Sequence, residues 1–275
     1  MKYLFLKLLP KNIFSKLMGQ LADLKAPAPL LESVIRTYAD FYKIDLTEMK
    51  KPLSEINCFN EFFTRELKDG LRPVDAAVDS LTSPVDGTIA EFGSIKDGLL
   101  IQTKGIYYSL SDLVGPKDAE TFDDGYFMTI YLSPADYHRI HTPYQGEVNR
   151  FSYFSGNLWP VNHFAVENIG GLFSINERIF TPLETEKGLI GMIKVGATVV
   201  GKIKTTYHPL ESNDNKGTKC DLPVTPSRKF AKGQEIGRFQ LGSTVILLME
   251  KGRFKEGDIS KGQKVKMGEM IGKIV

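Results

Sequence analysis

Cysteine content and net charge are both low in this sequence of 275 residues, and each shortage excludes a class of protein. The two cysteines, Cys58 and Cys220, lie far apart and form no C-x-x-C motif, so they indicate neither a disulfide framework nor a metal site. Lysine and arginine total 35 against 33 aspartate and glutamate residues, and the net charge of +2 produces no global field that would attract nucleic acid. We therefore expect a protein of a reducing compartment with an apolar core and no nucleic-acid partner.

Long apolar runs are also missing, even in the N-terminal segment, residues 1–20, where apolar residues are dense. This segment contains no acidic residue and four lysines, Lys2, Lys7, Lys11 and Lys16. A transmembrane helix needs about 20 consecutive apolar residues, and a signal peptide needs a continuous apolar stretch; Lys7, Pro10 and Lys11 interrupt both. Two interpretations stay open from these residues alone: a segment that lies in a membrane interface with its lysines toward anionic headgroups, and a helix docked on its own domain.

The apolar pattern changes character near Asp75. Before this point apolar residues recur at helical spacing, at Leu30, Leu31, Val34, Ile35, Tyr38, Phe41 and Tyr42. A second helix should carry Phe59, Phe62 and Phe63 and end near Gly70. After this point short β-rich runs alternate with Gly, Pro and Asn/Asp turns, as over residues 126–132, 191–203 and 245–249. The sequence predicts an α+β protein, with a helical region over residues 1–70 and a β-rich domain over residues 71–275.

Two short patterns occur twice in the β-rich part. Residues 83–89 parallel residues 142–148, each with an extended Pro step, a Gly turn and a new strand. A Gly-x-x-Ile-Gly pattern occurs at residues 233–237 and again at residues 268–272. Such hairpins resemble the biotinyl/lipoyl-type β-sandwich. A non-enzymatic carrier of this type, with Lys266 as the modified residue, is therefore one alternative for the whole chain.

The segment Gly242-Ser243-Thr244 directly precedes the apolar run 245–249. A serine hydroxyl beside a flexible glycine carbonyl, at the entry to a buried strand, is placed to attack its own peptide bond. The resulting ester would eliminate to dehydroalanine and hydrolyse, leaving a pyruvoyl group in place of Ser243. By itself a Gly-Ser-Thr segment before a strand is more often a turn, so this chemistry depends on a base and a carboxylate elsewhere.

Two of the four histidines, His138 and His141, supply a candidate base. At a spacing of three residues on a helical turn, both imidazoles would address the same cavity. No further His/Cys cluster stands near them, so we predict no metal site. Asp86, in a Pro-Val-Asp-Gly turn, either bonds its own backbone or orients the base. Together with Ser243, these residues contain the parts of a base-activated nucleophile; no G-x-S-x-G elbow indicates an α/β-hydrolase.

Successive blocks of the chain resemble the phosphatidylserine decarboxylase proenzyme family, in family order from about residue 55 to the C-terminus. The blocks are Phe62-Phe63-Thr64-Arg65-Glu66-Leu67, Arg72-Pro73, residues 83–87, residues 131–141, Leu158-Trp159-Pro160-Val161-Asn162, Asn176-Glu177-Arg178, Val195-Gly196-Ala197 and residues 241–244. The resemblance implies self-cleavage between Gly242 and Ser243, giving a β chain of residues 1–242 and an α chain of residues 243–275 that begins with the pyruvoyl cofactor. Asp86, His141 and Ser243 match the self-cleavage triad, and His138 matches the histidine of the decarboxylation step.

The resemblance also implies a substrate and a location. The enzyme would be a lyase of phospholipid biosynthesis that converts phosphatidylserine to phosphatidylethanolamine and CO2, the substrate amine condensing with the carbonyl formed at Ser243. It would work as a homodimer of αβ units, bound peripherally at the cytoplasmic face of the cell membrane. A lipid substrate favours the interfacial interpretation of residues 1–20.

Other assignments stay open. A pyruvoyl decarboxylase of a soluble amino acid is a second enzyme class, although such a substrate gives no reason for a basic, apolar N-terminal segment. Three arginines, Arg65, Arg139 and Arg178, either face the lipid phosphate or have structural roles. An aromatic group either lines an acyl-facing mouth or belongs to the core, namely Phe151, Tyr153, Phe154 and Trp159. His163 and His208 are interpreted as structural.

Overall fold

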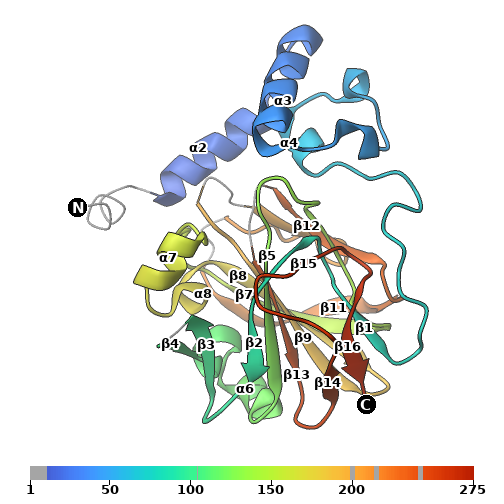
Figure 1. Ribbon diagram of the computed structural model, residues 1–275. Coiled ribbons are helices and arrows are strands. Elements are labelled where there is room, and N and C mark those ends of the chain that lie inside the picture. Colours follow the sequence, from blue (N-terminus) through green and yellow to red (C-terminus); the bar gives the residue numbers. More distant parts are fainter. Residues whose placement is uncertain (1–10, 104, 199–201, 214–216, 241–243) are drawn as a thin grey trace.

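The computed structural model describes residues 11–103, 105–198, 202–213, 217–240 and 244–275. Figure 1 shows helices near the N-terminus standing over one end of a larger β-rich part. The described residues form mostly strands with few helices, which confirms the predicted α+β class. Among them, no helix is long and apolar enough to cross a membrane. The division at residue 70 and the biotinyl/lipoyl resemblance stay predictions.

The helical region contains α2 (Lys11–Asp23), α3 (Ala28–Tyr42) and α4 (Phe59–Phe63), with two 3-10 turns, η1 (Leu46–Glu48) and η2 (Leu53–Glu55). The predicted helical spacing over α3 is confirmed, and the helix ends where Lys43 adopts a left-handed conformation. Its apolar face contributes to a small core. This region thus has apolar packing of its own, made of Leu31, Ile35, Met49, Ile56 and Phe62.

The second predicted helix is shorter than expected, since α4 ends at Phe63 and not near Gly70. The backbone beyond it pairs with the η1 segment instead. Lys50 donates its N–H to the Glu66 carbonyl at 2.8 Å, and Lys68 donates to the Glu48 carbonyl at 2.9 Å. These long-range bonds satisfy backbone groups that a longer helix would have satisfied internally, so tertiary pairing overrides local propensity.

The β-rich part is built on an antiparallel sheet of eight described strands, in the order β11-β7-β8-β9-β13-β5-β2-β15. Their bounds are β2 (Gly87–Ser94), β5 (Tyr126–Tyr131), β7 (Gly146–Phe154), β8 (Arg178–Thr185), β9 (Gly188–Val195), β11 (Lys219–Phe230), β13 (Thr244–Met249) and β15 (Lys264–Val265). The run expected at residues 245–249 is β13, whose six residues are all buried. Its side chains alternate between two core clusters, because the sheet is covered on both faces.

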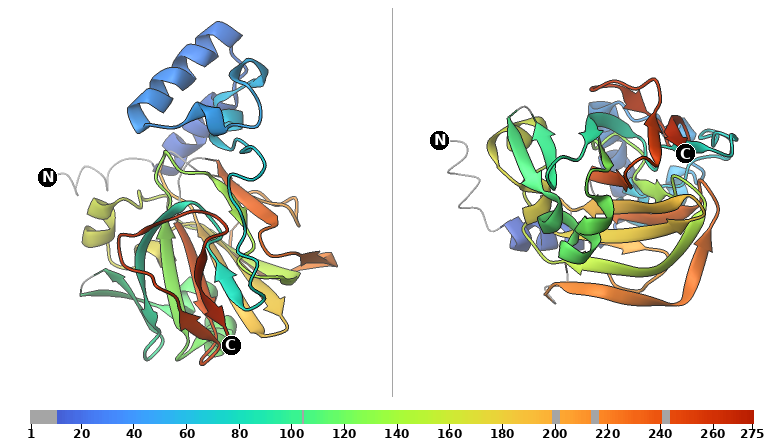
Figure 2. Two further views of the ribbon diagram at one scale, coloured as in Figure 1. Left: turned by 45° about the vertical axis from the view of Figure 1, so that its right-hand side comes forward. Right: turned by 90° about the horizontal axis from the view of Figure 1, so that it is seen from below.

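Smaller sheets and helices cover this large sheet. One has the order β10 (Lys202–Thr205), β12 (Glu235–Gln240), β6 (Arg139–His141), a second has the order β1 (Ser80–Thr82), β16 (Met270–Ile274), β14 (Phe254–Glu256), and β3 (Leu99–Thr103) pairs with β4 (Ile106–Ser109). The covering helices are α5 (Leu110–Val114), α6 (Pro116–Phe122), α7 (His163–Asn168) and α8 (Leu172–Ile175). Figure 2 again shows the blue helices above the strands in its left view, so the two parts meet at one end of the sheets.

The sequence repeat at residues 83–89 and 142–148 is confirmed as a repeated structure. Gly87 begins β2 and Gly146 begins β7, each three residues after a proline in a bend. A Cβ at Gly87 would lie 2.6 Å from the Tyr131 carbonyl oxygen, and one at Gly146 would lie 2.5 Å from that of Glu184. Glycine is required at both positions because the neighbouring strand approaches too closely for a side chain.

The run expected over residues 191–203 is two strands in the structure. β9 ends at Val195 and β10 begins at Lys202. Ladder pairing stops because the backbone of Gly196 is bonded elsewhere: its N–H donates to the Glu177 carbonyl, and its carbonyl accepts from the Asn176 side chain at 2.9 Å. A side-chain amide buried in this loop therefore ends the strand.

Candidate active site

The predicted cleavage site, Gly242-Ser243, lies outside the described residues, but the chain on either side of it is well defined. β12 ends at Gln240 in the small sheet. The chain enters the large sheet at Thr244, which pairs with Tyr131 on β5 and Val195 on β9. Thr244 is buried. The described chain thus leaves the small sheet at Gln240 and enters the large sheet at Thr244.

His141 is held on β6 in the form of a base. Its backbone N–H donates to the Pro84 carbonyl at 2.8 Å. Nδ1 lies 2.8 Å from the Gly233 carbonyl oxygen and so donates to it, which leaves Nε2 as the acceptor, 3.2 Å from the Tyr137 hydroxyl. Burial lowers the pKa of His141, so the imidazole is neutral near pH 7 and Nε2 can accept a proton.

Asp86 lies two residues beyond Pro84 and is bound by an arginine. Arg72 Nε lies 3.0 Å from Oδ1 and 2.9 Å from Oδ2, and Arg72 Nη2 lies 2.7 Å from Oδ2. The Met267 N–H donates to Oδ1 at 2.8 Å. Within the described chain, the hydrogen bonds of Asp86 thus go to Arg72 and Met267 and not to His141. Asp86 still acts on His141 through space, since its negative charge raises the pKa of that imidazole against the larger effect of burial.

His138 is fully buried between the helical region and the strands. Its ring packs on Phe63, with ring centroids 4.1 Å apart. Nδ1 lies 2.7 Å from the Asp136 carbonyl oxygen, while Nε2 has no hydrogen-bond partner in the part of the chain that is described. Desolvation, helped by the charge of Arg65, lowers the pKa of His138 to about 3. A buried ring nitrogen without a partner is costly and indicates a place where a partner can bind.

The prediction that the two histidines share one helical face is wrong. Arg139–His141 form the strand β6, which pairs with β12, with Arg139 opposite Arg238. His138 directly precedes this strand, and its carbonyl accepts the Phe239 N–H at 3.0 Å. Residues three apart on a strand point to opposite faces. His138 therefore packs on Phe63, whereas His141 meets Tyr137 and Gly233.

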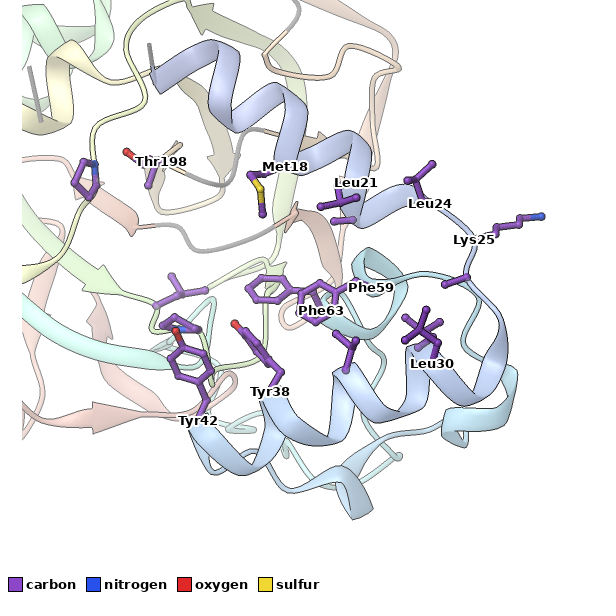
Figure 3. A pocket seen from close by; sticks show the side chains of 18 of the residues that line it. Met18, Leu21, Leu24, Lys25, Leu30, Tyr38, Tyr42, Phe59, Phe63 and Thr198 are labelled. Carbon is purple, nitrogen blue, oxygen red and sulfur yellow. The ribbon is translucent and has the colours of Figure 1, made fainter. Parts of the chain in front are cut away.

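A cavity of about 860 Å³ lies between the helical region and the β-rich part (Figure 3). Met18 and Leu21 from α2 face Tyr38 from α3 across it, with Phe63 from α4 between them. The lining is mostly carbon, and the far wall is formed by Tyr131, Leu132, Pro134, Pro160, Val161, Asn162, Ala197 and Thr198. The cavity wall thus includes Tyr131, which pairs with Thr244. It also includes Phe63, on which His138 packs.

Comparison with known proteins places the chain in a family. The family model described as phosphatidylserine decarboxylase matches residues 59–273. The chain belongs to the phosphatidylserine decarboxylase family. A phosphatidylserine decarboxylase proenzyme of Brevibacillus brevis is 39% identical over 267 residues, covering 96% of this chain and 94% of the relative. Proteins of the same name from Anaeromyxobacter sp. and Marinobacter nauticus are 41% and 42% identical, covering 97% and 96% of this chain and 96% and 94% of the relatives.

The three arginines considered for lipid phosphate differ in their partners within this decarboxylase. Arg139 forms ion pairs with Glu66 at 3.1 Å and Glu235 at 2.7 Å. Arg178 is buried and donates to four backbone carbonyls, those of Asp112, Leu113, Ser174 and Asn176. Arg65 is buried too and donates to the Ala135 carbonyl, while its Nε and Nη1 find no partner among the described residues. Arg139 and Arg178 are therefore structural. Arg65 has two nitrogens, Nε and Nη1, that could still donate hydrogen bonds.

The remaining candidates are structural in this member of the family. Phe154 and Trp159 belong to one core cluster, and Phe151 and Tyr153 to the other. His163 is exposed and lies 3.1 Å from the Glu167 carboxylate. His208 accepts the Leu210 N–H at 3.0 Å. The core interpretation of the aromatic group is confirmed.

Sequence reasoning missed the residues that hold the site together, which are Arg72, Tyr137, Gly233 and Met267. Arg72 and Tyr137 do lie in the motif blocks, but their type and spacing contain no signal of what they contact. Gly233 lies 92 residues from His141, and Met267 lies 181 residues from Asp86. Such contacts follow from the topology and not from local pattern.

Proposed function

We propose that this chain is a proenzyme that cleaves itself at Gly242–Ser243 and then decarboxylates phosphatidylserine to phosphatidylethanolamine and CO2. The observation that carries the proposal is the apolar cavity, whose wall includes Tyr131, the register partner of Thr244 at the start of β13, and Phe63, on which His138 packs. A space for lipid chains thus lies beside one candidate histidine and beside the strand that pairs with Thr244.

Self-cleavage needs a base and no oxidant or metal. The Ser243 hydroxyl attacks the Gly242 carbonyl carbon while its proton passes to Nε2 of His141. The peptide C–N bond breaks as a proton returns to the amine of residue 243, which leaves an ester. Loss of the α-proton of residue 243 forms the Cα=Cβ double bond and breaks the Cβ–Oγ bond, freeing the Gly242 carboxylate and leaving dehydroalanine. Its enamine tautomerises, and water releases ammonia to leave a pyruvoyl group.

Each described residue contributes a different part of that step. The Nδ1–H bond to the Gly233 carbonyl fixes the tautomer that leaves Nε2 available. Asp86 provides negative charge that stabilises the protonated imidazole once it forms. Positioning and proton transfer of this kind each contribute orders of magnitude in rate.

A pyruvoyl cofactor formed from Ser243 would supply the chemistry of the decarboxylation step. When formed, the group supplies a carbonyl that withdraws electrons from the substrate carbon that bears the carboxylate. In this proposal His138 Nε2, which is buried and has no partner among the described residues, takes a proton from the substrate ammonium group. The same nitrogen then returns a proton to the substrate carbon after CO2 leaves.

The cavity and the helices around it fit a lipid substrate. Exposure of an acyl chain to water would cost about 0.8 kcal/mol for each CH2 group, and the apolar cavity spares a chain that leaves the bilayer this cost. α2 docks on α4, where Ala22 packs with Phe63, yet several apolar side chains of α2, α3 and the linker between them remain exposed to water, including Leu17, Leu24, Leu30 and Phe41. Docking and interfacial binding are thus compatible. We propose that these helices bind peripherally at the cytoplasmic face of the cell membrane; the homodimer of αβ units stays a prediction from the resemblance.

Intact mass spectrometry of the purified protein tests the proposal. We expect the wild type to appear as two chains, the smaller with a blocked N-terminus that reacts with carbonyl reagents. The Ser243→Ala variant should remain one chain of 30.8 kDa, and the control Ser94→Ala, at an exposed serine, should cleave normally. A wild type that stays whole would favour the carrier with Lys266. Release of CO2 from free serine, and not from phosphatidylserine in vesicles, would favour the soluble amino acid decarboxylase.

A further inference from the structure

Three charged side chains form a continuous chain of ion pairs that joins the helical region to the candidate active site. Arg72 Nη2 lies 2.7 Å from Asp86 Oδ2 and 3.1 Å from Glu48 Oε2. Glu48 belongs to η1, Asp86 to the turn before β2, and Arg72 to the segment that connects the two parts. The side chains of Arg72 and Asp86 are each 9% exposed, and that of Glu48 is 29% exposed. Charges that are this shielded interact strongly because little water screens them.

The segment that carries Arg72 is fastened to the helical region. The Lys68 N–H donates to the Glu48 carbonyl at 2.9 Å, so the backbone of Glu48 holds this segment while its side chain holds the guanidinium. Arg72 Nη1 also donates to the Leu71 carbonyl at 3.0 Å. The position of Arg72 is therefore set by Glu48 and Leu71, which precede it in the chain. The contacts with Glu48 form only when η1 is folded against residues 66–72.

The same segment covers the groups around His141. Leu67 packs in one cluster with Tyr137 and Met267, and Leu71 and Val74 pack against that cluster. Tyr137 is the residue whose hydroxyl reaches His141 Nε2, and Met267 is the residue whose N–H reaches Asp86. The connecting segment thus packs on Tyr137, which contacts His141, and on Met267, which contacts Asp86.

Asp86 depends on Arg72 for its position. Within the described residues its oxygens accept from Arg72 and from the Met267 N–H, and neither oxygen is bonded to His141. Removing one partner of a buried ion pair leaves an uncompensated charge, which turns toward water or takes up a proton. In either case the negative charge beside the His141 imidazole would be lost.

We propose that Arg72 and Glu48 are positioning residues for self-cleavage, so that Asp86 is set beside His141 when the helical region has folded against the β-rich part. The inference rests on the proposed role of Asp86 in self-cleavage. Its consequence is an order of events: the lipid-facing helices fold first and the chain then cleaves. A molecule with an unfolded helical region would remain an uncleaved proenzyme.

A time course of self-cleavage during cell-free synthesis of the full chain tests the role of Glu48. The Glu48→Gln variant keeps the shape of the side chain and removes its charge, so Arg72 loses one of two anchors. We expect self-cleavage to slow at least about fivefold, with little change in melting temperature. The matched control is Glu55→Gln, an exposed carboxylate of the neighbouring η2, which should cleave within about twofold of the wild type.

Arg72 provides the second arm of the test. Arg72→Ala should slow self-cleavage by about a hundredfold, and guanidinium ions at millimolar concentration should restore part of the rate, which a general folding defect would not allow. Because Glu48 acts through Arg72, the double variant should cleave no more slowly than Arg72→Ala alone.

The outcomes separate this inference from the proposed function. A Glu48→Gln chain that cleaves at the wild-type rate overturns the inference, while cleavage of the wild type and its loss in Ser243→Ala would leave the proposed function intact. A double variant that is slower than Arg72→Ala by the full Glu48 effect also overturns it, since Glu48 would then act by another route. If the wild type itself never cleaves, the proposed function fails first.

Discussion

His138 and His141 are both buried, yet the hydrogen bonding of their ring nitrogens differs. His141 has both ring nitrogens bonded, one to a backbone carbonyl and one to the Tyr137 hydroxyl. His138 has one nitrogen bonded and the other without a described partner. A ring held at both nitrogens suits a base that must be aligned with a fixed peptide bond, whereas an open nitrogen suits a group that arrives later, such as a substrate.

The lowered pKa of His138 predicts how stability depends on pH. The unfolded chain binds a proton near pH 6.5 and the folded chain near pH 3, so stability is fully present above pH 6.5 and is lost as the pH falls through this window. In the uncleaved Ser243→Ala background, the free energy of unfolding should therefore decrease from pH 7 to pH 5. His138→Gln should reduce that decrease by about 2 kcal/mol, measured by urea unfolding at each pH.

NMR of the histidine ring protons provides the control for this prediction. In the folded Ser243→Ala chain the His138 resonances should not titrate between pH 7 and pH 5. If they do, or if His138→Gln leaves the pH dependence of unfolding unchanged, burial is not what controls this ring.

At the scale of elements, the site is assembled from turns between strands. The Asp86 turn leads into β2, His141 ends β6, and Gly233 precedes β12. The Gly233 backbone has φ +76°, and a Cβ there would lie 2.4 Å from the Val74 side chain. Glycine is therefore needed to place the carbonyl that fixes the His141 tautomer.

Replacing this glycine should damage both stability and self-cleavage. Gly233→Ala imposes a left-handed conformation on alanine and a clash with Val74. The matched control is Gly252→Ala, which has φ +71° and nothing within 4 Å of the added Cβ. We expect both to lose about 1 kcal/mol from the backbone, Gly233→Ala to lose about 1–3 kcal/mol more, and Gly233→Ala alone to cleave slowly. Equal unfolding midpoints and equal cleavage rates for the two variants would contradict this assignment.

At the scale of the whole molecule, helices cover one end of the sheets (Figure 1). They line an apolar cavity and expose further apolar side chains to water. Leu17 on α2 is 60% exposed and Phe41 on α3 is 77% exposed, and neither lines the cavity. Exposed apolar side chains on adjoining helices are typical of a surface that meets another apolar phase. The exposed surface of Leu17 and Phe41 is therefore distinct from the lining of the cavity.

The double variant Leu17→Gln with Phe41→Gln should therefore weaken membrane binding without changing self-cleavage. Burial of these two side chains in a membrane interface contributes a few kcal/mol at most, so we expect at least a tenfold loss of affinity in co-sedimentation with phosphatidylserine vesicles. Leu99→Gln, at an exposed leucine of β3, is the control and should bind as the wild type does. Unchanged binding by the double variant would place the membrane contact elsewhere.

Local pattern sufficed for several features, for identifiable physical reasons. Helical spacing predicted α3 because one face of that helix packs in a core. The apolar run 245–249 predicted β13 because both faces of the large sheet are buried. The family blocks pointed to Asp86, His138 and His141 before any geometry was known, and their roles stay predictions.

Only the tertiary structure decided how those residues are arranged. The histidine pair had helical spacing, but pairing with β12 made the segment a strand and turned the two rings apart. Arg72, Gly233 and Met267 entered the site through contacts between distant parts of the chain. The sequence by itself determined the chemical groups and the local elements, because these depend on residue type and short-range periodicity. The partners of each group were decided by chain topology, because hydrogen bonds and ion pairs depend on which backbone segments the fold brings together.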